Sequence, residues 1–176
     1  MGKNGSAWER ELKGILAGDD AALRDAARSC PPDEAKNYLK AAGRPFLVVR
    51  GAGSLGIDLV ALRADVSFPI EVKGATAPVI RFSDESGRMQ EQARAMSAEC
   101  GRAGVIPLYA YRRKGVRGGD AWRVFTLPAD GLDGRLRVLY DRVPKVARTP
   151  AGGFVMRWDE GLPLNKLLDY LCASPA

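Results

Sequence analysis

The chain has no histidine, and its three cysteines lie far apart in 176 residues. Without an imidazole, the sequence excludes Ser-His-Asp hydrolysis, histidine-bound nuclease metals and most catalytic zinc sites. Cys30, Cys100 and Cys172 form no CxxC pair, so we expect ordinary reduced thiols rather than a disulfide framework or a thiolate zinc site. Any hydrolytic chemistry must therefore use carboxylates, lysine and a hard divalent metal.

Long apolar runs are also missing from the sequence. No stretch approaches the length needed to cross a bilayer, and residues 1–8 contain no hydrophobic signal-peptide core. We therefore expect a cytoplasmic protein without a membrane span. With 46% hydrophobic content, the 176 residues are enough for one substantial core and too few for two comfortable domains. We expect a single domain over residues 1–176.

Positive charge is in modest excess, with 27 Lys and Arg against 21 Asp and Glu, a net charge of +6 and a pI near 9.4. Such an excess fits a polyanionic partner, although it can also serve solubility alone. A basic, glycine-rich turn concentrates Arg112, Arg113, Lys114 and Arg117. Phosphate contact is the natural use of this cluster, and a solvated loop is the alternative. Nothing in the pattern indicates base-specific reading.

Hydrophobic periodicity and turn residues predict alternating helices and strands. The expected helices cover residues 6–17, 22–27, 33–42, 85–102 and 164–171. The expected strands cover residues 46–49, 57–62, 68–72, 79–82, 105–111, 122–126 and 154–158. This order predicts an α/β fold with a mixed central β-sheet flanked by helices, in which the second and third strands form a hairpin or meander.

That hairpin would gather Asp58, Glu71 and Lys73 at one end of the sheet. Side chains two apart on a strand share a face, so Glu71 and Lys73 point together while Val72 points away. Phosphodiester hydrolysis can be carried by Mg²⁺ held between carboxylates, with a lysine to orient or deprotonate the attacking water. We predict Asp58, Glu71 and the Val72 carbonyl as metal ligands, and Lys73 as the water-activating or charge-stabilising group.

A plainer interpretation makes Asp58 a turn cap and Glu71 with Lys73 a solvated pair on an edge strand. The apolar sequence on either side favours the metal site, because charges in buried strands are costly unless they bind something. Glu9 is a further candidate ligand, although its spacing from Ser6 also matches a helix capping box. The two roles of Glu9 are compatible.

A glycine-rich loop follows the first predicted strand. Arg50, Gly53 and Ser54 lie in or beside this loop, and the glycines would let its backbone approach DNA closely. We predict that Arg50 and Ser54 contact the scissile phosphate. A plain flexible loop explains the glycines equally well.

Taken in order, several segments resemble the archaeal-type Holliday-junction resolvases, which also occur in viruses and belong to the PD-(D/E)xK nucleases. The segments that carry the resemblance are 6–12, 48–54, 57–61, 70–73, 89–93, 107–112, 122–125 and 152–154. They span nearly the whole chain, and their combined order is more specific than any single motif.

The resemblance implies a restriction-endonuclease-like fold and a homodimer that nicks four-way DNA junctions symmetrically with Mg²⁺, for which Mn²⁺ would substitute. It implies an archaeal cell, or a virus-infected host cell, as the setting. The site residues that it implies are Glu9, Ser54, Asp58, Glu71 and Lys73, with Arg50 and Gln92 as weaker DNA-contacting positions.

The chain departs from the family pattern in two places. Ile57 stands where a proline often precedes the aspartate, which should cost no metal ligand because only the carboxylate coordinates. Residues 19–43 look like a helical insertion, which could move Glu9 or alter the junction-binding surface. Two other functions stay open: a restriction-like or repair endonuclease that acts on duplex or flap DNA, and a non-catalytic DNA-binding protein of the same fold.

Overall fold

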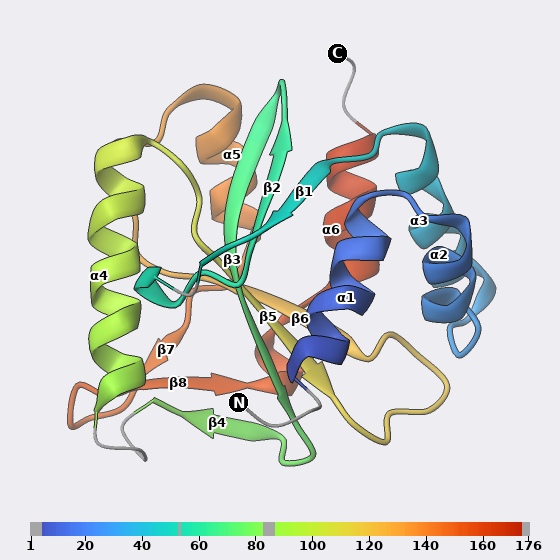
Figure 1. Cartoon of the computed structure of the whole chain (residues 1–176). Coiled ribbons are helices and arrows are strands. Elements are labelled where there is room, and N and C mark those ends of the chain that lie inside the picture. Colours follow the sequence, from blue (N-terminus) through green and yellow to red (C-terminus); the bar gives the residue numbers. More distant parts are fainter. Residues whose placement is uncertain (1–4, 53, 83–86, 174–176) are drawn as a thin grey trace.

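The computed structural model describes residues 5–52, 54–82 and 87–173. Its centre is a six-stranded sheet in the order β1-β2-β3-β5-β6-β9, with helices on both faces (Figure 1). These strands are β1 (Leu47–Arg50), β2 (Leu59–Arg63), β3 (Val66–Ala75), β5 (Leu108–Arg113), β6 (Trp122–Thr126) and β9 (Leu162–Pro163).

The sheet is mixed, as predicted. β3 and β5 run parallel, whereas the other neighbouring strands pair antiparallel. Parallel strands need a long crossover, and here it consists of β4 (Val79–Arg81) and α4 (Arg88–Ala103). A second, three-stranded sheet of order β4-β8-β7 contains β8 (Phe154–Arg157) and β7 (Ala147–Arg148).

Two apolar clusters lie on opposite faces of the main sheet, because successive strand residues point to opposite sides. On β5, Leu108 and Ala110 join the cluster that contains α1 (Gly5–Leu16) and α6 (Leu164–Cys172). Tyr109 and Tyr111, which alternate with them, join the cluster under α4 and the small sheet. The sheet is therefore buried on both faces around β5.

The predicted helices within residues 19–43 are confirmed as α2 (Asp20–Ala27) and α3 (Pro32–Leu39). They stack outside α1 and α6 (Figure 1). Asn37 on α3 donates to Asn165 at 3.2 Å, and the buried Tyr38 hydroxyl donates to Asp120 at 2.7 Å. Residues 19–43 are thus an integral layer of this fold, while their status as an insertion relative to the resolvases stays a prediction.

Three details of the predicted elements were wrong. Ser6 lies inside α1, which already includes Gly5, so the capping box does not form there. The first strand is not buried as a whole, because it lies at the sheet edge and leaves Leu47 67% exposed. The sequence prediction missed α5 (Gly134–Arg142), whose short pattern of Arg and Asp shows only a weak apolar periodicity.

The boundaries of other elements differ from the predicted ones by a few residues. The helix predicted from residue 85 begins at Arg88 in the structure, and residues 83–86 lie outside the described residues. Among the described helices, none combines the length and the apolar character that a membrane crossing requires.

Candidate active site

The β2–β3 hairpin positions Asp58 beside the ExK segment. Its antiparallel register pairs Leu59 with Ile70, so Asp58 lies just before β2 and opposite Glu71. The Asp58 amide donates to the Ile70 carbonyl at 3.0 Å, and Asp58 Oδ2 accepts from the Val72 amide at 2.8 Å. Backbone hydrogen bonds therefore fix this carboxylate against the middle of β3.

Glu71 and Lys73 lie on one face of β3, as the strand alternation predicted. Lys73 Nζ donates to Glu71 Oε1 at 2.5 Å, and the Glu71 side chain is buried while that of Lys73 is partly exposed. The other carboxylate oxygen of Glu71, Oε2, is buried and has no hydrogen-bond partner among the described residues. The structure thus brings Asp58, Glu71 and Lys73 together and leaves one acidic oxygen unsatisfied.

Electrostatics disfavour a charged Glu71 in the absence of a cation. Burial raises the pKa of Glu71 to about 7, the Lys73 ammonium acts in the opposite direction, and Asp58 adds a further increase. The buried Tyr109 phenol, which pairs with Glu71 in the parallel β3–β5 register, also has a raised pKa, through burial first and then through both carboxylates. The negative charge of Asp58 and Glu71 is therefore only partly balanced by Lys73.

The chemistry of these donors fits Mg²⁺. Hard cations prefer carboxylate and carbonyl oxygens, and the unsatisfied Glu71 Oε2 is such a donor. Because a strand residue directs its N–H and C=O to the same side, the Val72 carbonyl faces the Asp58 side with its amide. Asp58, Glu71 and Val72 are thus the residues that can hold a metal.

Glu9 lies apart from the Asp58 and Glu71 carboxylates. Its Oε2 accepts from Arg50 Nη2 at 2.7 Å, and its side chain is 13% exposed. Within residues 5–52, 54–82 and 87–173, no group of at least three Asp, Glu, Cys or His side chains is close enough to hold a metal. The structure therefore links Glu9 to Arg50 and does not gather it with Asp58 and Glu71.

The glycine-rich loop meets the site at Gly56. An added Cβ at Gly56 would lie 3.5 Å from Glu71 Oε2 and 3.5 Å from the Gln92 Cβ, so the predicted residue Gln92 lines the same space. Gly56 also has a φ of 73°, which glycine adopts without strain. Gly53 and the side chain of Ser54 lie outside the described residues.

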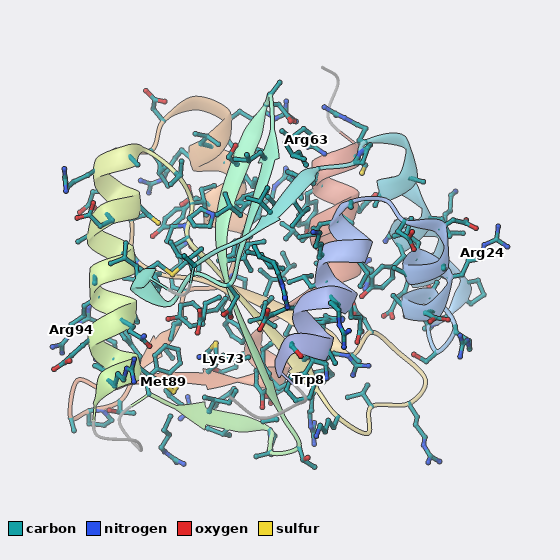
Figure 2. The ribbon with its side chains drawn as sticks, viewed as in Figure 1. Trp8, Arg24, Arg63, Lys73, Met89 and Arg94 are labelled. Carbon is teal, nitrogen blue, oxygen red and sulfur yellow. The ribbon has the colours of Figure 1, made fainter. Side chains whose placement is uncertain are left out.

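One contact of β3 next to the ExK segment was missed from sequence. The Trp8 ring lies directly on the Gly74 backbone, since an added Cβ at Gly74 would be 2.0 Å from the ring. Trp8 precedes Glu9 and Gly74 follows Lys73, so this packing docks the start of α1 onto the face of β3 opposite the Glu71 and Lys73 side chains (Figure 2). No periodicity or spacing connects these two positions in the sequence.

The basic residues of the β5–β6 turn have different surroundings. Arg112 is 25% exposed and donates to Glu11 Oε1 at 3.0 Å, while Arg113 lies 5.4 Å from the Trp158 ring centroid. Lys114 Nζ lies 5.1 Å from the Trp8 ring centroid, which brings it to the start of α1. Arg117 is exposed. The turn therefore contacts the start of α1 through Lys114, and Arg112 also anchors α1.

Comparison with known proteins identifies a related fold. The structure is similar to a Holliday junction resolvase, Hjc, from Archaeoglobus fulgidus, an archaeal hyperthermophile, with a TM-score of 0.54 and 17% sequence identity. The match covers 94% of this chain and 96% of that one. No protein-family model and no curated protein sequence matches the chain. The chain therefore shares the α/β fold of that protein, with a mixed six-stranded sheet flanked by helices.

Proposed function

We propose that this protein is a Mg²⁺-dependent, structure-specific DNA endonuclease that resolves four-way (Holliday) junctions by symmetric paired nicks. One observation carries the proposal: Glu71 presents a buried carboxylate oxygen without a partner, beside Asp58 and Lys73. A purely structural carboxylate would have its hydrogen bonds satisfied. The substrate class comes from the fold that the chain shares with the A. fulgidus resolvase.

In this proposal Asp58, Glu71 and the Val72 carbonyl hold Mg²⁺, and Mn²⁺ substitutes for it. The bound ion would supply charge stabilisation at the phosphate and lower the pKa of a coordinated water. Lys73 lies within hydrogen-bond reach of Glu71 and orients the attacking water or neutralises developing charge. Arg50, whose side chain is 49% exposed, contacts the scissile phosphate together with Ser54, and Glu9 positions Arg50.

Gly53, Gln92 and the β5–β6 turn hold the DNA through contacts to its phosphate backbone, and they do not read its bases. The protein acts as a homodimer in this proposal, because a twofold axis presents identical sites to two equivalent strands of a junction. Paired nicks then follow from symmetry.

The experiment compares the wild type with Asp58→Asn on a synthetic four-way junction and on a linear duplex of matched sequence, each with Mg²⁺. We expect paired nicks in the junction with the wild type and no cleavage with the variant. Asparagine keeps an oxygen that can accept from the Val72 amide, so the fold is retained. Equal cutting of the linear duplex would favour a restriction-like or repair endonuclease. Tight binding without cleavage would favour a non-catalytic DNA-binding protein.

A further inference from the structure

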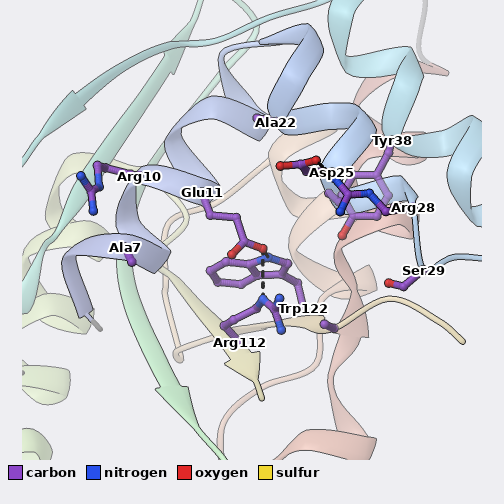
Figure 3. A pocket seen from close by; sticks show the side chains of 12 residues that line it. Ala7, Arg10, Glu11, Ala22, Asp25, Arg28, Ser29, Tyr38, Arg112 and Trp122 are labelled. Carbon is purple, nitrogen blue, oxygen red and sulfur yellow. Dashed lines mark hydrogen bonds and ion pairs between the residues drawn. The ribbon is translucent and has the colours of Figure 1, made fainter. Parts of the chain in front are cut away.

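A cleft of about 480 Å³ lies between α1, α2 and the β5–β6 hairpin (Figure 3). Arg10 and Glu11 of α1 line it, as do Arg28 beside α2 and Arg112 with Trp122 of the hairpin. Its walls include the small side chains Ala7, Ala22 and Ala26, which leave the space between the two helices open. The cleft exists only because residues 19–43 add α2 next to α1.

The acidic groups of the cleft are already engaged. Glu11 Oε1 accepts from Arg112 Nε at 3.0 Å and from Trp122 Nε1 at 2.8 Å. Asp25 pairs with Arg28, but this pair is exposed, with side chains 68% and 76% accessible. Exposed ion pairs contribute little, so an approaching phosphate can recruit the Arg28 guanidinium at small cost. The cleft therefore offers cationic groups to an anionic ligand.

The cleft lies next to the end of the β5–β6 turn. The Ser29 hydroxyl, one residue after Arg28, donates to the Gly119 carbonyl at 3.4 Å. The Asp120 amide donates to Glu34 Oε2 at 3.0 Å. Residues 19–43 thus contact the end of the β5–β6 turn at Gly119 and Asp120.

The cleft and Arg50, which we propose to contact the scissile phosphate, flank the same helix. On one side of α1, Glu9 contacts Arg50, and on the other, Glu11 contacts Arg112. A helix is about 10–12 Å across. About three nucleotides of a strand, at about 3.4 Å each, cover that distance.

We propose that this cleft binds the phosphate backbone of a DNA strand as it leaves the active site, and that Arg28 is the phosphate contact supplied by residues 19–43. This inference rests on the proposed nuclease function and gives the helices α2 and α3 a role in holding the substrate.

The chain offers a matched control for Arg28. Arg24 is also on α2, is 74% exposed and pairs with Asp20 at 2.9 Å, but it does not line the cleft. Figure 2 shows Arg24 at the outer edge of the molecule. The experiment measures Kd of the wild type, Arg28→Gln and Arg24→Gln for a fluorescent four-way junction, in EDTA and over a range of salt concentrations. Circular dichroism melting verifies that both variants fold.

We expect Arg28→Gln to weaken binding about fivefold and to lower the slope of log Kd against log salt concentration by about 1, because one phosphate contact is lost. Arg24→Gln should change binding by less than about twofold. Equal losses in both variants, or no loss in either, would overturn the cleft proposal. Binding without cleavage by the wild type would refute the nuclease but would leave phosphate binding by Arg28 in the cleft testable on its own, because binding is measured without metal. A wild type that binds no DNA would overturn both.

Discussion

The buried carboxylates Asp120 and Glu71, which are 2% and 5% exposed, have opposite surroundings. Asp120 Oδ1 accepts from the Tyr38 hydroxyl at 2.7 Å and the Trp122 amide at 2.8 Å. Its Oδ2 accepts from the Asn165 amide at 2.8 Å and from Asn165 Nδ2 at 3.0 Å. Each oxygen of Asp120 is therefore satisfied by groups that belong to the fold.

Glu71 receives a hydrogen bond from Lys73 on one oxygen, whereas its other oxygen is buried without a partner in the described part of the chain. Burial is nearly equal at the two carboxylates, so hydrogen-bond satisfaction distinguishes them. A satisfied carboxylate joins α3, β6 and α6, and an unsatisfied one keeps capacity for a ligand. Substitutions that alter one of the two regions at a time should separate these roles.

The largest expected effect is on cleavage. Changing Glu71→Gln should lower the cleavage rate on the order of 10³-fold or more, because it removes a group that acts at the reacting centre. Its free energy of unfolding should stay within about 1 kcal/mol of the wild type, since the lost ion pair is offset by no longer burying a charge. Single-turnover rates and urea unfolding measure the two quantities. Near-normal cleavage would show that Glu71 is no metal ligand.

The same chemical change at Asp120 should give the reverse result. Asp120→Asn replaces an accepting oxygen with an amide NH2 group that faces donors, which should reduce the free energy of unfolding by about 3 kcal/mol. For a chain of this length, Tm should fall by about 6–12 °C. Cleavage measured well below Tm should stay within about threefold of the wild type. A variant with wild-type Tm and lost cleavage would break the contrast between the two carboxylates.

A smaller effect is expected where α1 docks on β3. Gly74→Ala places a methyl group against the Trp8 ring, which should reduce stability by about 1–3 kcal/mol. The double variant Trp8→Ala with Gly74→Ala should lose less than the sum of the single changes, because the clash needs both side chains. Urea unfolding of the double-mutant cycle measures this coupling. Strict additivity would mean that the ring does not lie on Gly74 in solution.

The smallest effect is the response to metal. At ten times its Kd, Mg²⁺ should stabilise the wild type by about 1.4 kcal/mol, which corresponds to a Tm increase of about 3–6 °C. Asp58→Asn should not respond, whereas Asp120→Asn should show the full increase from its lower starting Tm. Differential scanning fluorimetry with and without Mg²⁺ gives the answer. An equal response from all three proteins would indicate binding elsewhere.

The sequence by itself determined the class of fold and the core of the site. Alternation in Glu71-Val72-Lys73 put two charges on one strand face, and a short connection after β2 made a hairpin with Asp58 at its edge. These are local properties, because strand period and hairpin register depend on neighbouring residues. The similarity to the A. fulgidus resolvase agrees with the predicted α/β fold.

Contacts between distant residues were decided only by the tertiary structure. The Trp8–Gly74 packing, the Asp120 cluster, the link from Glu9 to Arg50 and the cleft beside α2 each join residues far apart in sequence. The short α5 also escaped prediction, because its stability comes from packing rather than from its own periodicity. Whether a buried charge has partners depends on what the folded chain brings to it, and no local pattern contains that information.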